Sequence, residues 1–417
     1  MSQLGWVDFS SDERNKVKLV LAALNEPGTL DELGIGQIRD AFANRLFPGL
    51  STIQTRAKYF ITIARLLRDI QNGKAMKSKT PHLWLEQQEH LLAEALVRIH
   101  GDAEKGIIGA ESITNGGVSR RPSSIYWNGL KTFGIVKYKL SLHEFCTELG
   151  RNQYMPHLAN SDHQEGKDDD DVYLAKRWIE LPDLIEDWQA DDNLKISLSL
   201  KEAEFLKEKI STTPEVEHSV LAQILRNGGL SKLLPISSNV TSSVSSLVLN
   251  FDALASLLTN HESISERCKQ QIIQAQLFSL AMEGPHIRFN LLLAQANQFT
   301  TLVKTLESDF QEWLTEVKKQ EVFHPKCTNN WFCALSGSRI NPFSRTFVER
   351  WCELIANDAT IEQLDELVKK QAKDNKKSRS LLNKKRNNEN WVGIRRLDFR
   401  WGVGRRLLAD IEGGLNA

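Results

Sequence analysis

The stretch LFPGLSTIQTRAKYFITIARLLRD, residues 46–69, decides how the first part of the chain is interpreted. A shorter helical pattern at residues 38–45 and a turn at Pro48 and Gly49 precede it, as in a helix-turn-helix. Ser51 is a favourable N-cap, and Gln54 completes a capping box, which predicts that a helix begins here. The stretch is therefore either a DNA-reading helix or a helix that holds a core together.

The distribution of apolar side chains favours a core helix. Placed at about 100° per residue, they spread over roughly 220° of the circumference, so the helix is buried on more than one side. An exposed recognition helix keeps a wider polar face than the strip that carries Lys58 and Arg65. Arg56 and Arg68 project toward the apolar side, where each needs a carboxylate partner or a place at the rim. We interpret the stretch as a scaffold helix.

Composition restricts the possible class of protein. The 417 residues are enough for two or three domains, and 53 Lys and Arg balance 53 Asp and Glu, so net charge alone predicts no partner. Five cysteines without a CxxC pair argue against a disulfide framework and for a reducing, cytoplasmic compartment. No basic segment followed by an apolar run opens the chain, and no run of about 18 apolar residues occurs. We expect neither an export signal nor a membrane span.

Charge is segregated along the chain. No acidic residue lies between Glu111 and Glu144, whereas residues 162–192 contain twelve acidic and three basic residues. Residues 369–406 contain fourteen basic and three acidic residues. Using the acidic linker at 151–171 as the main boundary, we expect an N-terminal helical domain at 1–150, a second helical domain at 172–320 and a basic C-terminal region at 321–417.

The fold class that these patterns predict is mainly α. Apolar residues recur with helical spacing in six further stretches, and few stretches alternate like strands. The helical stretches are Trp84–Ile99, Leu200–Ile210, Glu217–Arg226, Val248–Leu258, Ser263–Met282 and Phe289–Lys319.

A winged-helix-like α+β segment is predicted near 118–150. Pro122 opens a short helix, Gly134 falls where its C-terminal cap belongs, and IVKYKL then alternates as a half-buried strand. Cations at the helix start and on the wing would meet phosphates. We call this set the basic island: Arg120, Arg121, Lys131, Lys137 and Lys139. The alternative is a helix and strand packed inside a helical domain.

The C-terminal region mixes arginines with large aromatic residues. Guanidinium groups beside tryptophan suit phosphate contact and base stacking, and they suit a protein interface equally well. The candidate nucleic-acid contacts here are Arg395, Arg396, Arg400, Arg405 and Arg406. The lysine-asparagine stretch KKSRSLLNKKRNNEN before them is expected to be flexible or a charged helix.

Motifs for common reactions are missing from the sequence, including GxxxxGK[ST], GxGxxG, GxSxG and HExxH. Residues 323–343 are similar to the HxK...GSxxN core of phospholipase D-like nucleases, with His324, Lys326 and Asn341 as candidate catalytic residues. The family's aspartate position is Trp331, and the GS pair, Gly337 and Ser338, falls one residue early. The segment also lacks the apolar strand that carries the family's histidine and lysine. Because the sequence contains one copy of this motif, two chains would have to form a dimer to complete an active site.

A zinc site could use side chains from the same region. The candidate ligands are His324, Cys327, Cys333 and Cys352. Their spacing matches no standard zinc site, and scattered buried cysteines explain it as well. No cofactor is expected.

Four blocks of sequence resemble an uncharacterised family of bacterial proteins of about 400 residues with a GWVDFS-type N-terminal motif. The blocks are GWVDFS, LGIGQIRDAFANRLFPGLSTIQTRAKYF, IYWNGLKTFGIV and LDFRWGVGRRLLADIEGGL, spread from residue 5 to residue 415. The resemblance implies an accessory component of an anti-phage defence locus, working beside a helicase or a nuclease. It implies no catalytic residue.

These observations lead to one main hypothesis of function and two alternatives. The main one is a non-enzymatic DNA-engaging or adaptor subunit of a defence complex. The alternatives are a phospholipase D-like nuclease that uses residues 324–341, and a helical scaffold that binds only protein.

Overall fold

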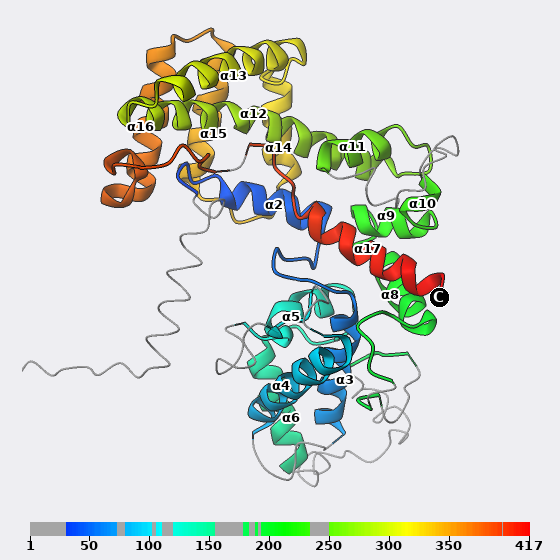
Figure 1. Ribbon diagram of the computed structural model, residues 1–417. Helices are drawn as coiled ribbons and strands as arrows, with labels where there is room; N and C mark the ends of the chain where they lie inside the picture. Colours follow the sequence, from blue (N-terminus) through cyan, green and yellow to red (C-terminus); the bar gives the residue numbers. More distant parts are fainter. Residues whose placement is uncertain are drawn as a thin grey trace, which may run out of the picture. The chain divides into compact units, whose positions relative to one another are not determined.

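The computed structural model describes residues 31–72, 80–101, 106–110, 120–154, 178–182, 188–190, 193–233, 250–393 and 395–417 (Figure 1). Regular structure in these ranges is helical, apart from one isolated antiparallel bridge between Val136 and Ile179. The mainly α prediction is confirmed. The chain forms two compact units, the first from Met1–Ala43 and Lys269–Phe399, the second from Asn44–Cys268 and Arg400–Ala417.

The first unit is a helical bundle with a core rich in tryptophan. Trp313 and Trp351 lie with ring centroids 5.9 Å apart, and Phe278 meets Trp331 edge-on at 5.6 Å. Each of these four rings is at most 3% exposed, so aromatic packing joins four helices. The elements of this unit are most of α2 (Gly36–Leu46), most of α12 (Glu266–Ala296), α13 (Thr300–Lys319), α14 (Pro325–Ala334), α15 (Pro342–Ala356), α16 (Ile361–Lys376), η4 (Lys377–Arg379) and η5 (Leu381–Asn383).

Helix α12 continues through a proline, although the sequence predicted separate helices at Ser263–Met282 and Phe289–Lys319. Pro285 lies inside α12 and cannot donate a backbone hydrogen bond. Side chains contact carbonyl groups just before it: Trp313 Nε1 donates to Leu280 O at 2.7 Å, and His286 Nδ1 lies 2.7 Å from Met282 O. The chain instead breaks between α12 and α13, where Gln298 has a positive φ of 60°. Packing therefore outweighs the local proline signal.

The second unit is built around α3, whose side chains are buried on almost every side. Phe60 meets Tyr126 edge-on at 4.8 Å and Phe133 at 5.3 Å, so α3 packs on α5. Burial of this helix confirms the scaffold interpretation. The elements are the end of α2 (Gly36–Leu46), α3 (Lys58–Gln71), α4 (Pro81–His100), α5 (Pro122–Thr132), α6 (Leu142–Tyr154), α8 (Leu200–Thr212), α9 (Val220–Arg226), α10 (Leu230–Leu233), α11 (Phe251–Thr259) and α17 (Trp401–Leu415).

The C-terminal helix α17 belongs to this second unit, where it packs on α8 and α9. Asp410 accepts hydrogen bonds from Ala57 N at 2.7 Å and from Arg56 Nε at 3.1 Å, which gives Arg56 its expected carboxylate partner. Glu412 accepts from Leu230 N at 2.5 Å. Carboxylates of α17 thus bind backbone donors at the starts of α3 and α10.

The predicted start of α3 is wrong by several residues. Ser51 N donates to Gln54 Oε1 at 3.2 Å, so half of the capping box forms, but it closes a turn and the helix begins at Lys58. The Gln54 amide also donates to Gly49 O at 3.1 Å. This second bond uses the side chain to hold the Pro48–Gly49 turn, which explains why the motif does not open the helix.

The prediction of a winged-helix-like segment near residues 118–150 is also wrong. Helix α5 begins at Pro122 as predicted, and Gly134, at φ 64°, donates to Lys131 O at 3.0 Å beyond its end. The predicted strand forms only the bridge of Val136, with Lys137 N donating to Trp178 O at 2.7 Å. No hairpin wing follows in the described residues, since α6 begins at Leu142. Most of α5 is buried, so it is a core helix and not a recognition helix.

None of the described helices combines the length and the apolar character needed to cross a membrane. The acidic linker predicted at 151–171 lies beyond residue 154 outside the described residues, so that domain boundary stays a prediction.

Candidate nucleic-acid interface

Three of the five cations in the basic island are engaged by the protein itself. Arg121 forms an ion pair with Glu86, and Lys137 forms one with Glu180. Lys131 Nζ donates to the carbonyls of Lys139 and Leu140 at 3.3 and 3.2 Å and lies 5.6 Å from the Trp127 ring. Burial lowers the pKa of the Arg121 guanidinium, although its ion pair favours the charged form.

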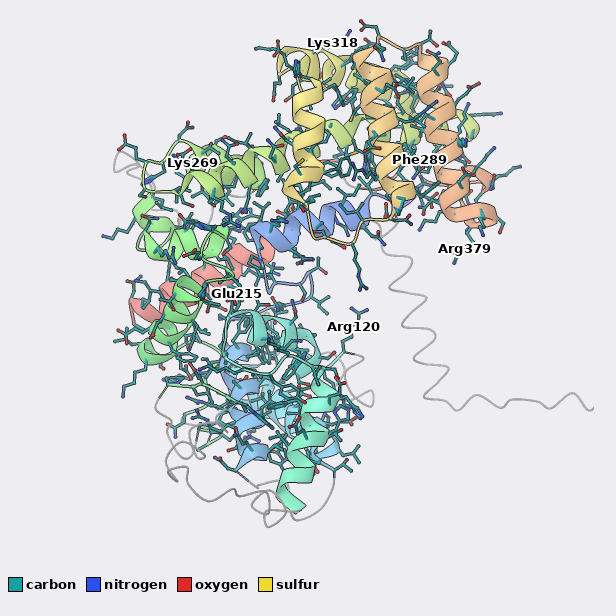
Figure 2. All side chains as sticks on the ribbon, turned by 180° about the vertical axis from the view of Figure 1, so that it is seen from behind. Arg120, Glu215, Lys269, Phe289, Lys318 and Arg379 are labelled. Carbon is teal, nitrogen blue, oxygen red and sulfur yellow. The ribbon has the colours of Figure 1, made fainter. Side chains whose placement is uncertain are left out.

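The other two members of the basic island, Arg120 and Lys139, are exposed. Their side chains have no carboxylate partner among the described residues, and Figure 2 labels Arg120 at the surface of the second unit. Two cations offer too little charge to define an interface by themselves.

The predicted contacts Arg395 and Arg396 hold a chain segment of the first unit in place. Arg395 pairs with Asp309 at 3.2 Å, and its guanidinium carbon lies 4.6 Å from the Trp391 ring centroid. Arg396 pairs with Glu283 at 2.7 Å and Glu316 at 3.1 Å. These bonds attach the segment to α12 and α13, so both guanidinium groups already have anionic partners.

The remaining predicted arginines, in the second unit, are also occupied. Arg400 Nη1 donates to Asn44 Oδ1 and to Leu50 O, both at 2.7 Å. Arg406 is exposed, but its Nη2 donates to Gln54 O at 3.3 Å. Arg405 is half-buried and has an interaction within the chain. The five arginines predicted as contacts therefore contribute mainly to the fold.

A different cluster of cations is free of such partners. It belongs to the basic run at residues 369–406, but none of its side chains was predicted as a contact. It lies at the end of α16, on η4 and just after η5. Seven exposed side chains in this part of the described chain have no carboxylate within ion-pair distance. We call them the basic surface: Lys369, Lys370, Lys373, Lys377, Arg379, Lys384 and Lys385. Figure 2 labels Arg379 at the tip of the orange segment, where side chains project outward.

The basic surface has a fixed backbone, because the segment before α2 is bonded beneath it. Gln371 Nε2 donates to Leu33 O at 2.6 Å, and Asn375 Nδ2 donates to Asp31 O at 2.7 Å. Buried Glu32 accepts from Ser380 Oγ and from Leu381 N, each at 3.2 Å. The first half of the stretch expected to be flexible or a charged helix therefore forms two short 3-10 turns, Lys377–Arg379 and Leu381–Asn383.

One buried carboxylate lies below these cations. Burial raises the pKa of Glu32, and the hydrogen bonds from Leu381 and Ser380, with the charges of Lys376 and Lys384, oppose that rise. Its charge offsets only part of the field, because residues 369–385 contain eight basic residues and a single acidic one, Asp374. The surface remains strongly positive.

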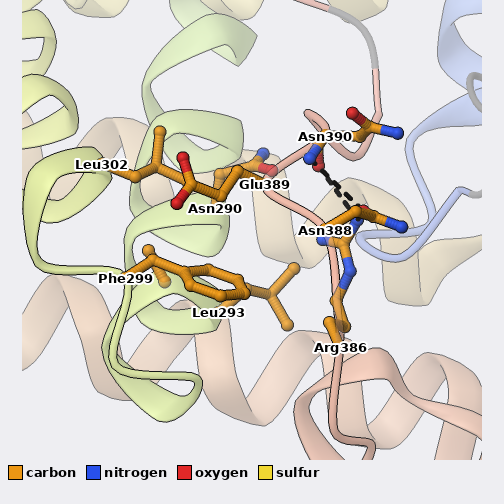
Figure 3. A pocket seen from close by; sticks show the side chains of 9 residues that line it. Asn290, Leu293, Phe299, Leu302, Arg386, Asn388, Glu389 and Asn390 are labelled. Carbon is orange, nitrogen blue, oxygen red and sulfur yellow. Dashed lines mark hydrogen bonds between the residues drawn. The ribbon is translucent and has the colours of Figure 1, made fainter.

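A shallow pocket lies where the chain leaves the basic surface (Figure 3). It holds roughly 200 Å³ of empty space, part of it open solvent, above an apolar floor that includes Leu293 and Phe299. Arg386 at its rim donates to Asn388 Oδ1 at 2.9 Å and to Asn390 O at 3.0 Å. These bonds direct Arg386 along its own loop, so we do not count it in the basic surface.

The candidate nuclease residues lie on helices. His324 is exposed and directly precedes α14, and Lys326 lies in the first turn of that helix. Asn341 caps α15, because its Oδ1 accepts from Phe343 N at 3.0 Å. The described backbone here contains no strand that could present the histidine and the lysine together, as phospholipase D-like cores do.

The candidate zinc ligands are not grouped in a way that indicates a metal. Within the described residues, no three His, Cys, Asp or Glu side chains come together as a possible metal site. Cys352 is buried on α15 and burial raises the pKa of its thiol, whereas Cys333 on α14 is exposed. The side chain of Cys327 lies outside the described part of the structure.

The second unit also contains ionisable groups that are deeply buried. Glu202 on α8 pairs with Lys58 at 2.7 Å and with Arg65 at 3.2 Å, and all three side chains are at most 8% exposed. Glu89 on α4 accepts from Ser123 N at 2.5 Å and from Ser123 Oγ at 3.1 Å at the start of α5. Burial raises the pKa of Glu89 to about 7. These groups join helices and are not accessible to a ligand.

Comparison with known proteins identifies the family of the chain. The family of unknown function DUF6361 matches residues 1–230, which is more than half of the sequence. The chain belongs to this family. No curated protein and no solved structure matches it. The matched residues include the segment that supports the basic surface from below, whereas the basic surface itself lies outside them.

A signal for the basic surface was present in the sequence. No acidic residue occurs between Asp374 and Glu389, which is the same acid-free pattern that drew attention to the basic island. The two acid-free runs differ in their surroundings, because among the described residues acidic side chains distant in sequence form ion pairs with cations of the first run, Arg121 and Lys137, and with none of the seven cations of the basic surface.

Proposed function

We propose that this chain is an accessory, non-enzymatic subunit that engages DNA in a bacterial anti-phage defence complex. The observation that supports DNA engagement is the basic surface, with seven exposed cations on a fixed backbone and no carboxylate partner among the described residues. Lysine and arginine groups that neutralise phosphates release condensed counterions, and this supplies most of the affinity of sequence-independent binding. Seven such groups fall within the range of about 6–10 phosphate contacts for which binding depends strongly on salt.

A purely structural explanation covers only part of the basic surface. Cations near the C-terminus of a helix are favourable because they meet the negative end of its dipole, and of the seven cations Lys373 lies in the last turn of α16. That effect falls off within the last turn, so it does not explain Arg379, Lys384 and Lys385. The excess of cations beyond the helix favours an external polyanion.

The exposed cations of the basic island, Arg120 and Lys139, are proposed as a secondary DNA contact. The paired arginines of the C-terminal region are not part of the proposed contact. The defence setting and a helicase or nuclease partner rest on the sequence resemblance, and identification of the proteins that co-purify with the native chain tests that part.

The main test is DNA binding by a variant that has lost three cations. Lys369, Lys373 and Lys377 are changed to Gln, and binding to a mixed pool of single-stranded and duplex DNA is measured by fluorescence anisotropy. Three lost phosphate contacts, at about 0.9 logarithmic units each, should weaken binding about 500-fold at a salt concentration near 0.1 M. The matched control changes the exposed Lys201, Lys232 and Lys304 to Gln, which alters net charge equally. Equal affinities for the two variants would exclude the basic surface as the contact.

The same protein preparations test the proposal that the chain is not an enzyme. Labelled DNA should remain intact after incubation with the chain, with and without His324→Ala. Cleavage by the wild-type chain that the substitution removes would instead establish the nuclease hypothesis.

A further inference from the structure

We infer that the basic surface binds duplex DNA through its phosphate backbone, in preference to single-stranded DNA and without regard to base sequence. This inference rests on the proposed function, because it names the form of nucleic acid that the same surface takes. It follows from three properties of the surface: which side chains it lacks, how its polar groups are used and how rigidly it is held.

Among the described residues, the segment that contains the basic surface has no exposed aromatic ring on which bases could stack. Proteins that bind single strands combine cations with exposed aromatic rings, and the stacking of each base on a ring adds to the affinity. No aromatic residue occurs between Trp351 and Trp391. Trp351 is fully buried, and the guanidinium group of Arg395 covers the ring of Trp391. A single strand would therefore gain little here beyond its charge.

Charge alone favours the duplex. Duplex DNA presents one phosphate charge about every 1.7 Å along its axis, roughly twice the density of one strand of that helix. Lys369 and Lys373 lie one helical turn apart, about 6 Å along α16, and the remaining cations continue the positive field past the helix end. An array of this extent meets more phosphates on a duplex than on an isolated strand.

Few side chains on this surface are available to form hydrogen bonds with the edges of bases. Six of the seven cations are lysines, which contact phosphate as point charges. The neighbouring amides are used within the protein: Asn383 donates to Lys377 O at 3.3 Å, and Asn388 accepts from Arg386 at 2.9 Å. Contacts to phosphates position a protein on DNA but carry no sequence information.

The fixed backbone points to the same conclusion. Buried Ser380 and Glu32 hold the turns between the lysines, so the cations have a set spacing. A flexible strand would lose conformational entropy to fit that spacing, whereas a duplex already presents phosphates at regular intervals.

The test compares duplex and single-stranded DNA of equal length, each in two unrelated sequences, over a series of salt concentrations. We expect tighter binding of the duplex, equal affinity for the two sequences, and a logarithmic salt slope near −0.9 per contact for the duplex against −0.7 for the single strand. The Lys369, Lys373 and Lys377 to Gln variant should flatten the duplex slope by about 2.7, three contacts at 0.9 each.

Two results would overturn the inference in different ways. Tighter binding of the single strand, lost on Phe343→Ala, would mean that this 38% exposed ring stacks with bases, and the proposed function would survive without the duplex preference. Absence of binding to either form would reject the proposed function together with the inference.

Discussion

The basic C-terminal run divides into two halves that look alike in sequence and differ in structure. In residues 369–385, seven exposed cations have no carboxylate partner among the described residues, whereas Arg395 and Arg396 are ion-paired and Arg400 and Arg406 donate to amide or carbonyl oxygens. Both halves have a net positive charge, +7 in residues 369–385 and +4 in residues 386–406. Pairing distinguishes cations that hold the fold from cations that are available to a polyanion.

The largest loss of stability on removing an ion-pair partner is expected in the buried network of the second unit. Glu202→Ala should lower the free energy of unfolding by about 3–5 kcal/mol, because Lys58 and Arg65 would remain buried without their shared partner. Chemical denaturation measures the effect. Glu204→Ala on the exposed side of the same helix is the control and should change stability by less than about 0.5 kcal/mol.

Glu89 contrasts with the paired Glu202. It is a buried carboxyl group that accepts hydrogen bonds but has no cationic partner among the described residues. Its pKa is raised by burial to about 7, so the unfolded chain ionises first as pH rises. The stability contribution of Glu89 is therefore fully present below about pH 4.5 and is lost as pH rises to about 7. Between pH 5 and pH 8 the loss should be about 2–3 kcal/mol.

The measurement is the free energy of unfolding of the wild type and of Glu89→Gln across that pH range. Glutamine can accept from Ser123 N without titrating, so the variant should show a smaller decline. Identical pH dependences would show that Glu89 does not titrate in this window.

A smaller effect is expected at the paired half of the C-terminal run. Arg396→Ala removes ion pairs to Glu283 and Glu316, but the arginine is 35% exposed and solvent screens the interaction. We expect a loss of about 1 kcal/mol in the free energy of unfolding. The exposed Arg350, which has no ion pair among the described residues, is the control, and an equal effect of Arg350→Ala would contradict the structural role of the pairs.

The smallest effect on stability is expected at the basic surface itself. Changing Lys369, Lys373 and Lys377 to Gln should alter the free energy of unfolding by less than about 0.5 kcal/mol, because no ion pair is lost. Thermal and chemical denaturation of the free chain measure it. A loss well above that value would assign these lysines to stabilising the end of α16.

The sequence predicted the helical class, the buried role of α3 and the start of α5. These features follow from local periodicity and from Pro122, which act within one helix. It misplaced the start of α3, since the use of Gln54 in holding a turn depends on how residues 46–54 fold back. It also predicted a strand at 135–140, where Val136 has only Ile179 as a bridge partner.

For a related reason, the sequence could not show which of the predicted contact residues are engaged within the protein. Whether an arginine is available to bind a ligand depends on carboxylates distant in sequence. Arg396, for example, pairs with Glu283. Periodicity and charge counts contain no information about such pairs. The acid-free run after Asp374 could have indicated the basic surface, but its ordered backbone depends on Glu32, more than 300 residues earlier.

Lys377 ends α16 with φ 51° and ψ −129°, a conformation in which glycine is favoured over any residue with a side chain. Holding lysine there destabilises the folded chain by about 1–3 kcal/mol. Selection for thermal stability alone would thus favour glycine at position 377 and remove a cation from the basic surface. Stability and DNA affinity are opposed at this residue, so variants chosen only for a higher melting temperature would tend to lose binding.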